Sequence, residues 1–126
     1  MKVAVTVWDN RISPVFDSAH TILITEIQSR KVAGKRFEPI DPDLPSRLAK
    51  RLTELGVSVL ICGAISEQPA DILEAAGIKL IPFIAGSAQK VLEDFAEDIS
   101  ITPDFLMPGC SQNYRRHAKS RLKHHA

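Results

Sequence analysis

Two cysteines offer the most reactive side chains of this sequence, and neither has a second cysteine nearby. Cys62 follows the apolar run 57–61, and Cys110 lies close to Met107 and ahead of His117. A cysteine thiolate is a ligand for soft metals such as copper or the iron of iron–sulfur clusters. We therefore predict Cys62 and Cys110 as candidate metal ligands.

Each cysteine also has a plainer interpretation. Cys62, at the end of an apolar strand, is typical of a small buried core residue. The basic residues that follow Cys110 favour its thiolate, but the same position is typical of an ordinary thiol in a flexible tail. The sequence leaves both alternatives open.

Several catalytic chemistries lack the residues they need. The chain has neither G-x-x-x-x-G-K-[ST] nor G-x-G-x-x-G, so we expect no nucleotide cofactor. His20 is the only histidine outside residues 111–126, and no nucleophile elbow accompanies it. The expected strands carry no cluster of carboxylates for two-metal chemistry. We therefore expect a protein that is not an enzyme.

The elements that would position Cys62 occur twice. Residues 52–66 and 73–87 each show a helix end closed by glycine, a short apolar strand, a turn and a serine that can cap the next helix. Such units build parallel sheets with helices on their faces, and ligands bind at the strand ends. A spacing of 21 residues matches Cys62 with Phe83, so one turn offers a thiol and the other an aromatic wall.

The hydrophobic pattern predicts one α/β domain over residues 1–97, followed by an extended exit and a flexible basic tail over 98–126. Because no helix separates the first three strands, we expect a three-layer α/β/α fold with a mixed sheet of about five strands. The expected strands are 3–8, 20–27, 31–38, 57–62 and 78–83, and the expected helices are 46–55, 67–76 and 88–97.

Three loops, 9–19, 63–66 and 82–87, should meet at one edge of this sheet. Two of them lead into helix N-termini, which favour an anion, and their glycines would let the backbone approach a ligand closely. Apolar walls suit a bulky, soft anion of low charge density. Alternatively, the glycines only serve tight turns. The predicted ligand-binding residues are Ser13, Phe16, Cys62, Gly63, Ala64, Ile65, Phe83, Gly86 and Ser87.

Charge is unevenly distributed along the chain. Residues 111–126 hold five of the 16 Lys and Arg residues and no acid, so residues 1–110 are mildly acidic within a total net charge of +1. A basic tail binds phosphates without specificity, but only Tyr114 could stack on a base, so nucleic acid is a weaker expectation than an acidic partner. No apolar run approaches a membrane span, the start at Met1 shows no signal peptide, and unpaired cysteines suit the cytoplasm.

Three stretches, 11–19, 56–65 and 75–79 followed by Gly86, together resemble one family. They are similar, over about residues 1–97, to the dinitrogenase iron-molybdenum cofactor biosynthesis family, which includes NifX-like proteins, NifB C-terminal domains and orange-protein-like members. The resemblance implies a ribonuclease H-like fold without nuclease activity, and a role in carrying a metal–sulfur cluster between donor and acceptor proteins. Many members have His-Phe-Gly where this chain has Val15, Phe16 and Asp17.

Two hypotheses from different classes follow. The leading one is non-enzymatic binding, carriage or assembly of a molybdenum-, iron- or copper-sulfur cluster or its precursor. Cys62 and the backbone at Gly63 and Gly86 would line the site, and Cys110 could close over it. The alternative is a regulatory or interaction module whose basic tail binds an acidic partner or nucleic acid.

Overall fold

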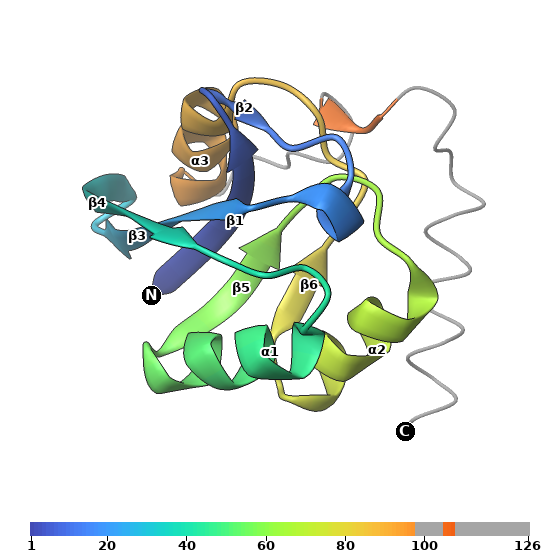
Figure 1. The fold of residues 1–126 in the computed structure, drawn as a ribbon. Helices are drawn as coiled ribbons and strands as arrows, with labels where there is room; N and C mark the ends of the chain where they lie inside the picture. Colours follow the sequence, from blue (N-terminus) through green and yellow to red (C-terminus); the bar gives the residue numbers. More distant parts are fainter. Residues whose placement is uncertain (98–104, 108–126) are drawn as a thin grey trace.

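The computed structural model describes residues 1–97 and 105–107, and the exit and tail predicted beyond residue 97 fall outside the described residues except at 105–107. No helix in this described part is both long and apolar enough to cross a membrane. The elements, shown in Figure 1, are β1 (Lys2–Trp8), β2 (Arg11–Ile12), the 3-10 helix η1 (Phe16–Ser18), β3 (Thr21–Gln28), β4 (Lys31–Pro39), α1 (Pro45–Glu54), β5 (Val57–Ile61), α2 (Glu67–Ala75), β6 (Lys79–Ile81) and α3 (Ala88–Ala96).

The strands form one mixed sheet in the order β4-β3-β1-β5-β6. β1 runs antiparallel to β3 and parallel to β5, β3 and β4 form an antiparallel hairpin, and β5 and β6 are parallel. The predicted mixed sheet is therefore confirmed. The sixth strand, β2, pairs with β1, and its Arg11 also bridges to Ser87. It lies inside the predicted loop 9–19, where a strand of two residues leaves no readable pattern.

Helices cover both faces of this sheet, as predicted (Figure 1). Successive strand side chains point to opposite faces. Along β1, Val3 and Val5 pack in the cluster with α3, whereas Ala4 packs in the cluster with α1 and α2. We call these two sides the α3 face and the α1/α2 face. Burial on both faces explains why the central strands read as continuous apolar runs.

Glycines end the first two helices as their position in the sequence predicts. Gly56 and Gly77 follow α1 and α2 with φ of +79° and +89°, which is the left-handed conformation of a helix C-cap. Ser87 caps α3, since its side chain accepts a hydrogen bond from the Lys90 N–H at 3.3 Å. Ser66 does not cap α2 in this way.

The two repeated units are shifted by one residue in the sheet. Ile61 pairs with Ile81, so the strands correspond at a spacing of 20 residues rather than 21. Beyond the paired strands, the Cys62 N–H donates to the carbonyl of Ile81 at 3.1 Å and the Cys62 carbonyl accepts from the Ile84 N–H at 3.0 Å, so Cys62 lies beside both Pro82 and Phe83.

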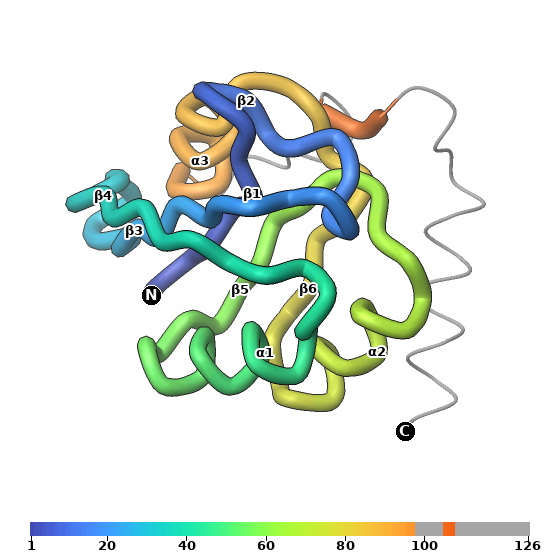
Figure 2. Tube along the Cα trace, in the orientation of Figure 1, coloured from blue at the N-terminus to red at the C-terminus, as the bar shows by residue number. Residues whose placement is uncertain are grey.

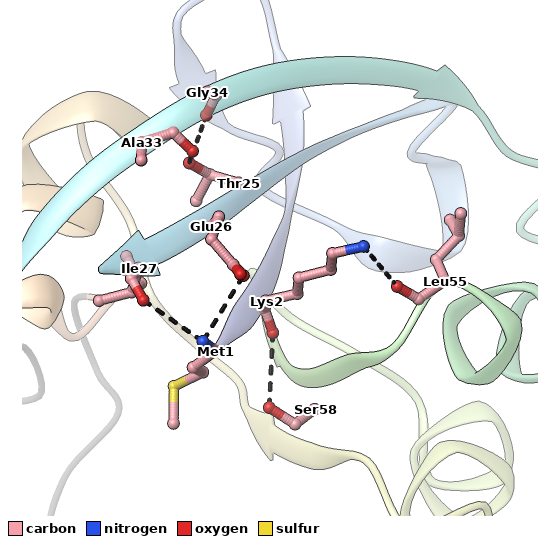
Figure 3. Close-up of polar contacts among 9 residues, drawn as sticks. All are labelled: Met1, Lys2, Thr25, Glu26, Ile27, Ala33, Gly34, Leu55 and Ser58. Atoms are coloured by element: carbon pink, nitrogen blue, oxygen red, sulfur yellow. Dashed lines mark hydrogen bonds and ion pairs between the residues drawn. The ribbon is translucent and has the colours of Figure 1, made fainter.

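Polar contacts fasten the end of the sheet where β1 begins (Figure 3). The Met1 ammonium group donates to the carbonyl of Ile27 at 3.3 Å and lies 3.5 Å from a Glu26 carboxylate oxygen. The Lys2 ammonium group donates to the carbonyl of Leu55 at 3.0 Å, which places a cation at the C-terminus of α1. These contacts fasten the start of β1 to β3 and to the C-terminus of α1.

Candidate functional site

The loops expected to meet at one edge of the sheet do so through backbone hydrogen bonds. The Ala64 N–H donates to the carbonyl of Pro14 at 2.8 Å, and the Phe16 N–H donates back to the carbonyl of Ala64 at 2.7 Å. The Phe83 N–H donates to the carbonyl of Gly63 at 2.9 Å, which joins the third loop. These particular donors are used within the chain rather than offered to a ligand.

Gly63 serves the contact between loops. A β-carbon at this position would lie 2.3 Å from the carbonyl oxygen of Ser13 and 2.4 Å from that of Pro14. The missing side chain therefore admits the backbone of residues 13–14, and the expectation that Gly63 admits a ligand is corrected. The backbone of residues 13–14 thus occupies the space beside Gly63 where we expected a ligand.

Gly86 is covered by a segment that is distant in sequence. Its φ is +125°, and a β-carbon would lie 3.2 Å from the ring of Phe105. Residues 105–107 run beside the loop 82–87 (Figure 2): Ala85 N–H donates to the carbonyl of Phe105 at 2.7 Å, and Met107 N–H donates to that of Phe83 at 2.8 Å. A ligand on Gly86 would have to displace this segment.

Cys62 lies in the core. Its exposed fraction is 0%, and it belongs to the apolar cluster on the α1/α2 face together with Phe16, which is also fully buried. Burial, and to a lesser extent the charge of Asp17, raises the pKa of the Cys62 thiol far above its ordinary range. A metal ligand must be a thiolate, so this geometry corresponds to the plainer interpretation of Cys62 as a core residue. Cys110 and His117 lie outside the described residues.

The N-terminus of α2 already holds an acidic group of the chain itself. The side-chain hydroxyl of Ser66 donates to the carboxylate of Asp17, which comes from η1. This contact puts a negative charge where the helix dipole favours one. It also links residues 13–19 to α2, so an external anion would compete with Asp17.

A hollow of about 660 Å³ lies on the other side of residues 13–19, above β1, β3 and β4. Its size is typical of a small-molecule site. Trp8 and Phe37 are its most exposed apolar lining residues, at 68% and 60%, whereas Val7 and Ala19 are buried. The lining residues are Val7, Trp8, Asp9, Ser13, Pro14, Val15, Ser18, Ala19, His20, Thr21 and Phe37.

Polar groups of the hollow are few and differ in role. The hydroxyls of Ser13 and Ser18 both donate to the carbonyl of Val15 at 3.3 Å, so they brace the loop that forms one wall. His20 and Asp9 are exposed and supply an imidazole and a carboxylate. Within the described residues no group of three or more His, Cys, Asp or Glu is placed to hold a single metal ion. The hollow thus offers apolar area with two potential donor side chains.

Of the predicted ligand-binding residues, Ser13 lines this hollow. Phe16 and Cys62 are in the core, Gly63 is buried, and Ala64 and Ile65 are half-buried at the contact between loops. Phe83, Gly86 and Ser87 lie on the loop before α3, away from the hollow. Sequence reasoning missed Trp8, His20 and Phe37, although an exposed tryptophan at a strand end followed by Asp-Asn was a usable signal.

Comparison with known proteins gives one family and several similar folds. The family model described as dinitrogenase iron-molybdenum cofactor matches residues 1–98. The crystal structure of PH0822 has a TM-score of 0.70 and 17% identity, covering 82% of this chain and 97% of the other. A Methanocaldococcus jannaschii protein, described in its structure as a proposed dinitrogenase, has a TM-score of 0.62 and 24% identity, covering 78% and 89%.

A Thermotoga protein, described in its structure as a candidate NifB protein, has a TM-score of 0.62 and 21% identity, covering 86% of this chain and 98% of the other. At these identities the structural matches show the shared fold alone. A search of curated proteins gave no match.

Proposed function

Because this chain belongs to the dinitrogenase iron-molybdenum cofactor family, we propose that it is a non-enzymatic carrier of a metal–sulfur cluster or its precursor. The cargo would occupy the hollow beside residues 13–19. The observation that supports this most is the family match over residues 1–98, which includes every residue that lines the hollow.

The chemistry of the hollow supports a soft anion as cargo. Its lining is largely apolar, and burying a compact, strongly hydrated anion there would cost more free energy than burying a large one whose charge is spread over sulfides. A preformed cluster already holds its metals through sulfide, so one or two protein donors are enough to orient it. His20 offers an imidazole nitrogen, a ligand that suits copper and iron better than a carboxylate does.

The contact network of residues 13–19 supports a preformed site. The Val15 carbonyl accepts from both serine hydroxyls, and Asp17 is held by Ser66, so the wall of the hollow is fixed at both ends. We infer that the chain works in the cytoplasm with a cluster donor and a cluster acceptor, and that Cys110 assists binding.

Anaerobic titration with tetrathiomolybdate, a sulfur-rich anion, tests the proposal. We expect uptake that is followed by visible absorbance and equilibrium dialysis, and His20→Ala should weaken it at least about fivefold. Leu44→Ala is the matched control, since Leu44 is an exposed apolar residue outside the hollow and its variant should bind normally.

Three results would contradict the proposal in different ways. Absence of uptake by the full chain, together with metal-free and sulfide-free protein from its native host, would remove the carrier function. Uptake that is unchanged in His20→Ala would remove the hollow as its site. Uptake that depends on Cys110 alone would move the site to the C-terminal residues.

A further inference from the structure

β4 is the last strand of the sheet, and within the described residues no strand pairs with its outer side. It is nine residues long, and Phe37 near its end is 60% exposed. A long strand edge with unpaired N–H and C=O groups is a template for pairing with another strand.

The direction of the free backbone groups follows from the ladder with β3. The Ile40 N–H donates to the carbonyl of His20 at 2.9 Å, so that residue faces β3. Backbone groups alternate along an antiparallel strand, hence Glu38 and Arg36 also face β3, and Phe37 and Pro39 face outward. Pro39 has no N–H, and the outward side of an edge strand is where proline is tolerated.

The side chains near Phe37 also alternate in a defined way. Phe37 is opposite Leu23, which packs on the α3 face. Arg36 and Glu38 are on the α1/α2 face, where their side chains lie 3.8 Å apart and Glu38 also pairs with Arg51 at 2.9 Å. An arginine and a glutamate on one face, at equal distances before and after an exposed aromatic residue, make this edge complementary to itself.

We propose that β4 pairs with β4 of a second copy of this chain, antiparallel and about a two-fold axis at Phe37. Each Phe37 N–H would donate to the Phe37 carbonyl of the other copy, and the two rings would lie side by side on the α3 face. Arg36 of each copy would face Glu38 of the other on the opposite side of the sheet. Closed two-fold symmetry requires this kind of self-complementary patch.

The same strand limits the extent of this pairing. Lys35 would lie opposite Pro39 of the copy, and Pro39 accepts one hydrogen bond but cannot return one. The interface is therefore short, and the dimer is concentration-dependent rather than permanent. Because Phe37 also lines the hollow, the ring of the second copy would extend the apolar wall at its mouth.

Amide hydrogen exchange of the full chain, measured over about a hundredfold range of concentration, tests the pairing directly. We expect protection of the Phe37 N–H to rise with concentration. The Glu38 N–H, which already faces β3, should show the same protection throughout and serves as the internal control. Exchange at Phe37 that is independent of concentration would overturn the proposal.

Sedimentation equilibrium of two variants gives a second, independent measurement. Phe37→Lys places two like charges at the two-fold axis and should raise the dimer dissociation constant at least about tenfold. Gln68→Lys adds the same charge to an exposed residue of α2, outside β4, and should leave it unchanged. Thermal unfolding would verify that both variants fold. A monomer at every concentration, or a dimer that Phe37→Lys does not weaken, would contradict the pairing.

Discussion

The Cys62 thiol gives the stability of this protein a specific dependence on pH. Burial raises its pKa in the folded state, so the folded chain keeps the proton where an exposed cysteine loses it. Above about pH 8.5, the ordinary pKa of cysteine, the unfolded state releases its proton and becomes more favourable. The free energy of unfolding should therefore fall as pH rises, by up to about 1.4 kcal/mol per pH unit from this group.

Urea unfolding of the wild type and Cys62→Ala between about pH 7.5 and 10 measures this contribution. The variant should be less stable by about 1 kcal/mol at neutral pH, and its stability should fall less steeply with rising pH. Since both proteins retain the other titrating groups, parallel pH profiles would show that Cys62 does not carry the effect.

Gly63→Ala should be the most damaging glycine substitution near the site. The added methyl group would overlap two backbone carbonyl oxygens, at 2.3 and 2.4 Å, and backbone cannot move aside cheaply. We expect a loss of about 3 kcal/mol in the free energy of unfolding. Gly77→Ala is the control, since Gly77 has positive φ but open space around it, and its loss should be about 1 kcal/mol. Equal losses in urea unfolding would show that the loops can separate.

The residue types could be predicted from the sequence better than their partners. The sequence left Cys62 open between ligand and core, and the structure places it in the core. The sequence marked Gly63 for close approach by a ligand, whereas the backbone of residues 13–14 fills that space. It could not tell that the neighbour of Gly63 is the chain itself, because that neighbour is a loop about 50 positions earlier. Close approach looks the same in sequence whether a ligand or a second loop fills the space.

At the scale of elements, the turn between β3 and β4 contains residues that are not the most stabilising for its conformation. Ser29 and Arg30 both have positive φ, 51° and 62°, in a two-residue hairpin loop. Asparagine tolerates this conformation better than serine does. Ser29→Asn should raise the free energy of unfolding by about 0.5 kcal/mol, measured as a higher urea midpoint with an unchanged m-value. An unchanged midpoint would mean that stability does not depend on this turn, and a lower one that asparagine fits it worse than serine.

Helices and strands were predicted within one or two residues at most ends, because each had a local signal. Gly56 and Gly77 followed α1 and α2, and serines preceded α2 and α3. β6 was predicted over 78–83 but ends at Ile81, since Pro82 interrupts the apolar run and Phe83 adopts a φ of +63°. Its register against β5, at a spacing of 20 residues rather than the 21 of the sequence repeat, had no local signal.

At the scale of the whole molecule, the hollow depends on strand order. Trp8 ends β1, His20 precedes β3 and Phe37 belongs to β4, so these residues meet only because the three strands are neighbours. The sequence predicted a mixed sheet but no order for its strands. Parallel strands bring their carboxyl ends together by rule, and from that rule the sequence predicted the loop edge at 63–66 and 82–87 but not the hollow on the other side of residues 13–19.

The contacts of the segment 105–107 predict how far the chain can be shortened without loss of stability. It supplies the carbonyl of Phe105 to Ala85 and takes that of Phe83, and its phenyl ring lies over Gly86. A protein that ends at Glu97 should lose about 1–3 kcal/mol of stability, whereas one that ends at Met107 should keep the stability of the full chain. Thermal unfolding of the two shortened proteins beside the full chain measures this, and equal stability at both lengths would contradict it.

A consequence for protein engineering follows from this segment. The family match ends at residue 98, so an expression fragment cut there would separate the loop before α3 from the segment 105–107 that covers it. Such a fragment would leave Phe83 and Gly86 newly exposed and available to neighbouring molecules. Crystallisation or labelling of a fragment that ends near residue 98 would then report a surface that the longer chain hides.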